Sequence, residues 1–347
     1  MVDNPQVRGS RIVVLGTGGT IAGKAPVADD NVGYVAGQVG VADMLHGIDA
    51  PAGIELVAEQ VAQLDSKDMD VATWRSLVTR CAAWLAEADV AGIVVTHGTD
   101  TLEETAFLLH CVLAPSKPIV MVSAMRPSTA LAPDGPQNLR DAIAVVATPG
   151  AHGVCAVAAG VVHGAQDVRK VHTYRLDAFD SGDAGALGYV EEGVLRRLRE
   201  WPSFDPADSA KVRQRLEQVV CTPPARWPRV EIVTSHAGAS GRLVDLLLRE
   251  LAAETGADGA DRLRGLVIAS TGNGTVHRDL EAAALRAQEA GVAVMRATRC
   301  ANGRIVSAPE SETTSAGHVI ALRSANTLTP VKARIELTLE LMESMPV

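Results

Sequence analysis

The sequence has few aromatic residues and few cysteines, and it has no long apolar segment. Aromatic side chains make up 3% of the 347 residues, so we expect a core packed with Ala, Val, Leu and Ile. The five cysteines are scattered without a C-x-x-C pair, which argues against a thiolate zinc site and a thioredoxin-type motif. Such a dispersed, odd set is typical of reduced thiols. The longest apolar run, Gly153 to Val162, is too short to span a bilayer.

Basic residues are fewer than acidic ones: the sequence has 32 Lys and Arg and 41 Asp and Glu, so the formal net charge is -9. A general nucleic-acid binder needs a basic face, and an anionic membrane attracts basic segments, so both partners are disfavoured. The polar N-terminus, Met1 to Ser10, has no basic-then-apolar leader. We therefore expect a cytoplasmic protein that binds neither nucleic acid nor membrane.

Short apolar, β-branched runs alternate with helical patterns along the chain. Nearly all-apolar runs of about five residues are typical of parallel strands that are buried on both faces. The alternation predicts an α/β fold with helices on both sides of a parallel sheet. The expected strands are Ile12–Leu15, Gly92–Val95, Ile119–Val122, Val154–Val162, Val230–Val233, Leu266–Ala269 and Val292–Met295, and the expected helices are Trp74–Leu85, Thr101–Leu113, Asn138–Ala147, Leu243–Glu254, Leu280–Ala290 and a last helix that begins with Thr329 and Pro330.

A proline-rich stretch, Arg196 to Trp227, interrupts this alternation. Prolines are typical of loops and linkers. We therefore expect a larger N-terminal α/β domain over residues 1–205, a linker over 206–228 and a smaller C-terminal α/β domain over 229–347. Within the linker, Ser209 to Val219 can form a short helix.

A glycine-rich loop, Leu15-Gly-Thr-Gly-Gly-Thr20-Ile-Ala-Gly23-Lys24, follows the first predicted strand. Open α/β sheets bind ligands at the carboxyl ends of their strands. A dinucleotide fingerprint is disfavoured because its third glycine falls on Ile21, and a P-loop is disfavoured because Ala25 replaces the magnesium-binding hydroxyl. Two interpretations stay open: the hydroxyls of Thr17 and Thr20 serve chemistry, or the segment is a plain tight turn.

A second polar loop, Thr96-His-Gly-Thr99-Asp100-Thr101, ends another predicted strand and precedes a helix. The free N–H groups of a helix N-terminus can hold a carboxylate or an oxyanion. Alternatively, Asp100 and Thr101 only cap the helix, since Thr101-Leu-Glu-Glu104 has the capping-box pattern. Two such loops in one sheet favour a functional site. The sequence has neither an H-E-x-x-H nor a G-x-S-x-G motif, so we predict neither a metal centre nor a serine-hydrolase elbow.

Four polar segments carry a resemblance to a known family, namely Thr17-Gly-Gly-Thr20-Ile-Ala-Gly23, Thr96-His-Gly-Thr99-Asp100-Thr-Leu-Glu-Glu104-Thr-Ala, Met121-Val-Ser-Ala-Met-Arg126-Pro-Ser-Thr129 and Asp134-Gly-Pro-x-Asn138-Leu. Together they resemble the bacterial L-asparaginases. This resemblance implies a larger N-terminal domain of the flavodoxin type, a linker and a smaller C-terminal α/β domain. It also implies homotetramers built from tight dimers, with no metal and no cofactor.

The resemblance also implies residue roles. Thr20 matches the hydroxyl that attacks the side-chain amide, and Tyr34 matches the tyrosine beside it. A second hydroxyl–carboxylate–ammonium group is implied at Thr99, Asp100 and Lys170. Lys67 departs from the family, because many secreted members carry an amide there. The substrate-binding positions implied are Ser66, Lys67, Thr99, Asp100, Thr275 and Glu310, of which Glu310 is given to the site by a neighbouring subunit.

These roles fit the chemistry of amide hydrolysis. A carboxamide is a poor electrophile, so its site needs a nucleophile, a base and oxyanion donors. Backbone N–H groups of the segments Gly18–Thr20 and Gly98–Thr99 are the expected oxyanion donors. We expect an L-asparaginase that acts on asparagine through a Thr20 acyl-enzyme. The alternatives are a glutaminase-asparaginase of broader specificity, another amide hydrolase such as an amidotransferase component acting on charged tRNA, and a catalytically silent amino-acid-binding protein.

Overall fold

The computed structural model of the chain describes residues 10–27, 30–202, 204, 206–253, 262–306 and 322–345. The chain forms two compact units, Met1–Val220 and Cys221–Val347, each with its own sheet. Residues 206–228, the expected linker, contain helix α5 (Ser209–Cys221) between two short 3-10 turns. In the part of the chain that is described, no helix is long and apolar enough to cross a membrane.

The N-terminal unit contains an eight-stranded sheet with the strand order β10-β9-β6-β5-β4-β3-β1-β2. Its five parallel strands follow the order 2-1-3-4-5, which is the flavodoxin-like order, so the expected fold class is confirmed. The strand order reverses at β1, because β2 lies on one side of β1 and β3, β4 and β5 follow on the other side. Sheets of this kind bind ligands at this switch point, between β1 and β3. These strands are β1 (Arg11–Gly18), β2 (Glu55–Leu64), β3 (Val90–Thr96), β4 (Ile119–Val122) and β5 (Val154–Ala158).

The prediction of a single strand over residues 154–162 is wrong. The chain instead folds into an antiparallel hairpin of β5 and β6 (Val161–Gly164), because Ala159 and Gly160 turn it with positive φ angles of 49° and 76°. Two more antiparallel strands extend the sheet beyond β6, namely β9 (Gly188–Glu191) and β10 (Val194–Arg197).

Strand β2 is missing from the sequence-based expectation. It forms an edge of the sheet, and none of its ten side chains is fully buried. Without a buried face it has no continuous apolar run, and a continuous run is the signal that marked the central strands.

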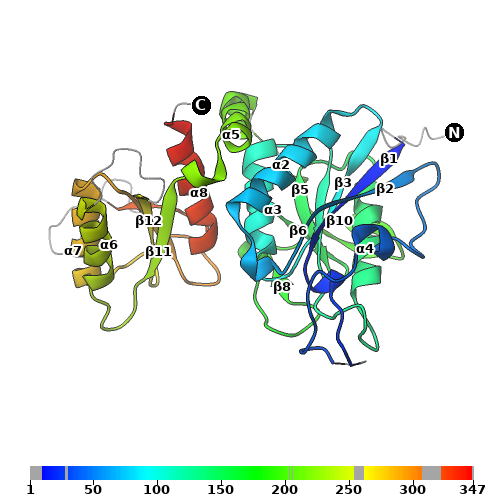
Figure 1. The fold of residues 1–347 in the computed structure, drawn as a ribbon, viewed down its shortest axis with the longest axis horizontal. Helices are drawn as coiled ribbons and strands as arrows, with labels where there is room; N and C mark the ends of the chain where they lie inside the picture. The colour runs from blue at the N-terminus through cyan, green and yellow to red at the C-terminus, as the bar shows by residue number, and fades with distance from the viewer. Residues whose placement is uncertain are drawn as a thin grey trace. The chain divides into compact units, whose positions relative to one another are not determined.

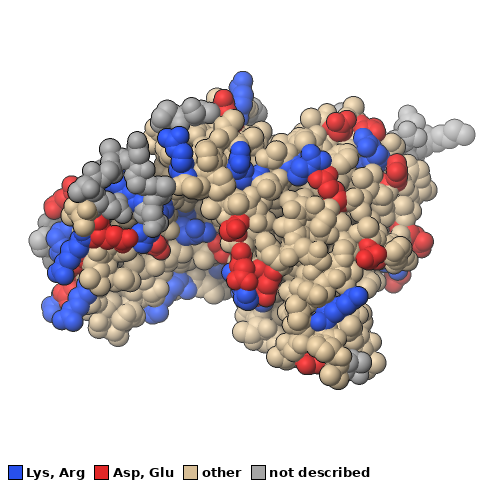
Figure 2. Space-filling view, in the orientation of Figure 1, with Lys and Arg blue, Asp and Glu red and all other residues tan. Residues whose placement is uncertain are grey.

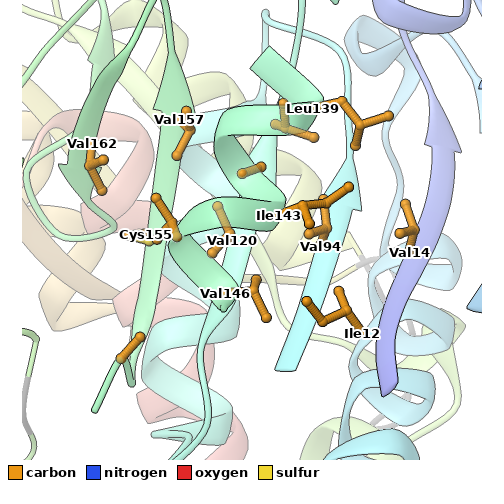
Figure 3. Close-up of a cluster of buried hydrophobic side chains, with 14 of the residues drawn as sticks. Ile12, Val14, Val94, Val120, Leu139, Ile143, Val146, Cys155, Val157 and Val162 are labelled. Atoms are coloured by element: carbon orange, nitrogen blue, oxygen red, sulfur yellow. The ribbon is translucent and has the colours of Figure 1, made fainter. Parts of the chain in front are cut away.

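Helices cover both faces of this sheet (Figure 1). Helices α2 (Val71–Ala86) and α3 (Leu102–Leu113) pack together on one face, and α4 (Gly135–Val146) packs on the other, near the short α1 (Val41–Met44). Figure 3 shows side chains of α4 facing those of the central strands. Burying each such aliphatic side chain contributes roughly 1.5–3 kcal/mol, so this core holds the strand ends of the sheet rigidly.

The C-terminal unit has a four-stranded parallel sheet in the order β11-β12-β13-β14. Helices α6 (Arg242–Ala253) and α7 (Arg278–Glu289) cover one face, and α8 (Pro330–Glu343) covers the other. Thr329 caps α8 by accepting a hydrogen bond from the Lys332 N–H, as the sequence predicts. The strands are β11 (Arg229–Thr234), β12 (Leu263–Ser270), β13 (Ala293–Thr298) and β14 (Arg323–Ser324).

Charged side chains of both signs are dispersed over the described surface that Figure 2 shows. Lys and Arg side chains form no continuous basic stripe on that face. Electrostatic binding of a nucleic-acid backbone needs such a concentration of positive charge.

Candidate active site

The glycine-rich loop turns sharply where β1 ends. Gly18 and Gly19 have positive φ angles of 105° and 81°, which favour glycine. A Cβ on Gly19 would clash with the backbone of Gly98, in the loop that follows β3. The two polar loops therefore touch backbone to backbone, at the switch point of the sheet.

The two threonines of the first loop have different surroundings. The hydroxyl of Thr17 donates to the Thr96 carbonyl at 2.8 Å, and this bond ties β1 to β3. The hydroxyl of Thr20 instead lies 2.7 Å from the hydroxyl of Tyr34, and either group can donate. Thr20 sits in a short 3-10 turn (Thr20–Ala22) and is 6% exposed. Thr17 is thus engaged with the main chain, whereas Thr20 is paired with the phenolic hydroxyl of Tyr34.

Backbone hydrogen bonds hold Tyr34 next to this turn. Lys24 and Val35 exchange two of them, at 3.0 and 2.9 Å, and the Gly37 N–H donates to the Gly19 carbonyl at 3.1 Å. A Cβ on Gly23 would lie 2.8 Å from the Tyr34 ring, so a glycine makes room for the tyrosine. The segment that carries Tyr34 is therefore anchored to the turn that carries Thr20.

The second loop carries a hydroxyl and a carboxylate that both contact an ammonium from another strand. The Lys170 ammonium donates to the Thr99 hydroxyl oxygen at 2.8 Å and to Asp100 Oδ1 at 2.6 Å. Lys170 lies on β7 (Arg169–Lys170), which pairs with β8 (Phe179–Asp180). The Lys170 side chain is 19% exposed and that of Asp100 is 54% exposed. An amine placed here can take the Thr99 proton once it has itself lost one.

A third loop, the 3-10 turn Ser66–Asp68, adjoins the second one. Ser66 is 2% exposed, and its Oγ accepts a hydrogen bond from the Asp100 N–H at 3.3 Å. The Lys67 ammonium is paired with the Asp68 carboxylate, and this hydrogen bond raises the pKa of Lys67. Ser66 therefore faces the second loop, whereas the charge of Lys67 is engaged within its own turn.

Contacts join most of the sequence-predicted site residues. Ser66, Asp100 and Lys170 form one hydrogen-bonded chain with Thr99. Thr20 and Tyr34 form the adjacent pair, across the contact of Gly19 with Gly98.

Three of the predicted residues are not part of this constellation, the first being Lys67, whose charge is paired with Asp68. Thr275 belongs to the C-terminal unit, where its hydroxyl bonds to Thr271. Glu310 lies outside the described residues.

His97, the histidine of the second loop, is buried and neutral. Burial lowers its pKa to about 4. One ring nitrogen lies 2.8 Å from the Gly98 carbonyl oxygen, and the other lies 2.9 Å from the Thr105 hydroxyl. A carbonyl oxygen only accepts, so Nδ1 carries the proton and Nε2 accepts from Thr105. His97 thus packs beneath the loop, as a residue that does not titrate near neutral pH.

The side-chain cap predicted for Thr101 is not formed. Thr101 precedes the first residue of α3, but its side chain makes no capping hydrogen bond. Its hydroxyl donates instead to the Ser66 carbonyl at 2.8 Å. The sequence carries no signal for this contact, because the two residues are 35 positions apart.

The motif around Asp134 is structural. The Asp134 carboxylate accepts hydrogen bonds from the N–H groups of Met125 and Arg126, each at 2.9 Å. Asn138 bonds to the Ser123 carbonyl and the Ala159 N–H, at 2.9 and 3.1 Å. These side chains fasten the loop after β4. In the described ranges, no group of three or more His, Cys, Asp and Glu side chains could hold a metal ion.

Comparisons with known proteins place this arrangement in context. Residues 11–202 match the model of the family described as asparaginase, N-terminal, and residues 229–346 match the glutaminase/asparaginase C-terminal domain. The chain is 34% identical to L-asparaginase 2 of Escherichia coli (strain K12), over 96% of this chain and 89% of that protein. It is 33% identical to a glutaminase-asparaginase of Pseudomonas fluorescens biotype A, over 94% and 84%. The crystal structure of a probable cytoplasmic L-asparaginase from Campylobacter jejuni superposes with a TM-score of 0.81 at 31% identity, covering 96% of both chains.

Proposed function

The chain belongs to the asparaginase family, and from this premise we propose that it hydrolyses the side-chain amide of L-asparagine to L-aspartate and ammonia. One observation carries the proposal. The loop with the Thr20–Tyr34 hydroxyl pair touches the second loop, through Gly19 and Gly98. In the second loop, Thr99 and Asp100 are both bonded to Lys170. This supplies a nucleophile, a candidate base and loop backbone N–H groups as candidate oxyanion donors at one point of the sheet.

The first half of the proposed reaction forms an ester on Thr20. Its Oγ1 attacks the amide carbon of asparagine, and the Thr20 proton passes through the hydroxyl network to the leaving nitrogen. The C–N bond then breaks, so that ammonia leaves and a β-aspartyl ester remains on Thr20. Backbone N–H groups of the two touching loops stabilise the oxyanion, a contribution of about 3–4 kcal/mol where one such donor is removed in other enzymes.

The second half returns the enzyme to its free state. A water molecule attacks the ester carbon, its proton passes through the network to Thr20 Oγ1, and the C–O bond to Thr20 breaks, so that aspartate leaves and the Thr20 hydroxyl is restored. The Thr99–Lys170–Asp100 group orients this water and moves the proton, because its ammonium is hydrogen-bonded to both the hydroxyl and the carboxylate, and Gly98, the neighbour of Thr99, touches the first loop. Thr99 supports both half-reactions in this scheme.

Substrate binding falls to groups that surround this centre. Ser66 and Asp100 hold the α-carboxylate and α-ammonium of asparagine, and the charge of Lys67 stays with Asp68. Thr275 and Glu310 complete the site in an assembled homotetramer, a dimer of dimers that needs no metal or cofactor. A cytoplasmic location agrees with the five cysteines, none of which is paired in a disulfide.

The assembly can be tested by subunit mixing. Inactive Thr20→Ala subunits mixed with inactive Glu310→Ala subunits should recover partial activity, since some sites in the hybrids become wholly wild type. Subunit exchange is monitored with a mass tag. Exchange without recovered activity would mean that the sites are not shared.

A substrate panel tests the proposed function. Ammonia release is measured with L-asparagine, L-glutamine, D-asparagine and succinamic acid, and L-asparagine should give the highest kcat/KM. Similar values for glutamine would favour a glutaminase-asparaginase, the activity named for the Pseudomonas relative. Binding of asparagine without any ammonia would indicate an amino-acid-binding protein and would contradict the proposal.

A further inference from the structure

Thr101 stands at the start of α3 but does not act as its cap. A threonine at this position ordinarily accepts a hydrogen bond from an N–H of the first turn, a contact worth about 1 kcal/mol. Here the backbone of Thr101 has φ -120° and ψ 17°, outside the extended conformation usual for a capping residue, and its side chain makes no such bond. The hydroxyl is turned toward the Ser66–Asp68 loop and donates to the Ser66 carbonyl at 2.8 Å.

This contact holds Ser66 together with a second bond from the neighbouring residue. Asp100 donates its backbone N–H to Ser66 Oγ at 3.3 Å, while Thr101 holds the carbonyl of the same serine. The Ser66 carbonyl also accepts from the Met69 N–H at 3.1 Å, which closes the 3-10 turn. Two consecutive residues of the second loop therefore fasten both the main chain and the side chain of Ser66.

The fastening sets the direction in which the Ser66 hydroxyl donates. Its oxygen already accepts the Asp100 N–H, and the described part of the chain offers its hydrogen no acceptor. Gly98 packs so closely on Ser66 that a Cβ atom on Gly98 would clash with the Ser66 Oγ. The hydroxyl is thus buried, crowded and free to donate, which suits it to a ligand carboxylate.

We propose that Thr101 is a positioning residue that presents Ser66 to the α-carboxylate of the substrate. This inference rests on the proposed function, in which Ser66 binds that carboxylate. The carboxylate does not react, so its contacts are made equally in the ground state and the transition state. Weakening them raises KM and leaves kcat almost unchanged.

Three substitutions separate positioning from capping. Thr101→Val keeps the shape but loses both the donor and any capping oxygen. Thr101→Asp is a strong helix cap, but as a carboxylate it has no hydrogen to donate and it repels the Ser66 carbonyl. Thr101→Ser keeps the donor. We expect KM for asparagine to rise about 3- to 10-fold in the Val and Asp variants, the range for one lost hydrogen bond, and to stay within about twofold in the Ser variant.

Thermal unfolding and a matched control complete the test. Thr101→Val should raise KM with kcat unchanged while thermal unfolding shows that the variant is folded at the assay temperature, a KM-against-kcat split that a merely structural residue would not produce. Thr79→Val removes another hydroxyl, which bonds to the Arg75 carbonyl within α2, and should leave KM unchanged. If Val and Asp at Thr101 leave KM unchanged, or if kcat falls as much as kcat/KM, the positioning role is overturned.

Ser66→Ala distinguishes this inference from the proposed function. It should raise KM, and adding Thr101→Val to it should change KM little further, because the second substitution then has nothing to position. A raised KM in Ser66→Ala with an unchanged KM in Thr101→Val overturns the inference alone. An unchanged KM in Ser66→Ala overturns the assignment of Ser66, and the inference with it, whereas ammonia release in the substrate panel still decides the reaction.

Discussion

Loops of glycine and threonine end a parallel strand in both units, but their hydroxyls have different partners. In the C-terminal unit, the Thr271 and Thr275 hydroxyls lie 2.9 Å apart, and each bonds to the carbonyl of the other residue at 3.0 Å. In the N-terminal unit, the Thr20 hydroxyl meets Tyr34, and the Thr99 hydroxyl meets Lys170. The first arrangement is closed on itself, whereas the second joins its hydroxyls to ionisable groups from other segments.

This comparison shows what a glycine and threonine pattern can and cannot indicate. The glycines allow the sharp turn in both places, since Gly18, Gly19, Gly272 and Gly274 all have positive φ. Catalysis by such a hydroxyl requires in addition a proton acceptor or donor, which another segment of the fold places next to it. On this basis we propose that the N-terminal loops carry the reaction and that the C-terminal loop contributes at most to binding.

The largest difference between the units should appear when their threonines are truncated. Thr20→Ala and Thr99→Ala should each lower kcat by about a thousandfold or more, because each removes a reacting or proton-carrying oxygen. Thr275→Ala should lower kcat by no more than about tenfold, since its hydroxyl is satisfied by Thr271. Steady-state kinetics on variants with wild-type circular dichroism would decide. A Thr275 effect as large as that of Thr20 would remove the distinction between the loops.

The lysine of the N-terminal site gives the next largest effect. Lys170→Met removes the ammonium that contacts Thr99 and Asp100, and kcat should fall about 10²- to 10⁴-fold, the range for a general acid or base. Lys117→Met is the matched control, because that ammonium donates only to the carbonyls of Leu85 and Glu87 among its described contacts. Equal kinetics for the two variants would argue that the Lys170 contact is only structural.

Acid should weaken the N-terminal unit through two buried histidines. Burial lowers the pKa of His97 and of His163 to about 4, below the value near 6.5 of an unfolded histidine. Between these values the unfolded chain binds protons that the native chain does not, so the free energy of unfolding falls as pH decreases from about 6.5 to about 4. Each histidine contributes on the order of 3 kcal/mol over the full window.

Urea unfolding between pH 7 and pH 5 checks this expectation, because most carboxylates titrate below that window. His163→Asn should make the stability of the unit less dependent on pH. A free energy of unfolding that stays constant from pH 7 to pH 5 would show that the histidines are not held neutral.

Lys67 should give the smallest effect. Its side chain is 60% exposed and its charge is paired with Asp68, so its repulsion of a substrate ammonium is weak. Lys67→Gln should lower KM for asparagine by no more than about threefold with kcat unchanged, and should not affect succinamic acid, which lacks the amino group. A raised KM would show instead that Lys67 binds the carboxylate.

The sequence predicts those parts of the molecule whose signals are local. Central strands such as β3 and β4 are continuous apolar runs, and the last helix begins at Thr329 with Pro330 as expected. The edge strand β2 escapes prediction because an exposed edge needs no apolar run. The antiparallel end of the sheet escapes because strand direction depends on the turn at Ala159 and Gly160.

The candidate site follows the same division between local and distant signals. The loops of Thr20 and Thr99 stand out in the sequence, and the family resemblance adds Tyr34 and Lys170 to them. The diversion of Thr101 from its helix to Ser66 is a contact between distant segments, and only the fold brings it about. Its local sequence signal, a capping box, indicates the wrong role.

The central claim is that Thr20, rather than Thr99, carries the acyl group. The most direct test is acid quenching of the enzyme during the first turnovers with L-asparagine, followed by proteolysis and mass spectrometry. We expect the mass of one aspartyl group on the peptide that contains Thr20, and its absence in Thr20→Ala. The same mass on the peptide that contains Thr99, with the Thr20 peptide unmodified, would contradict the account and reverse the roles of the two loops.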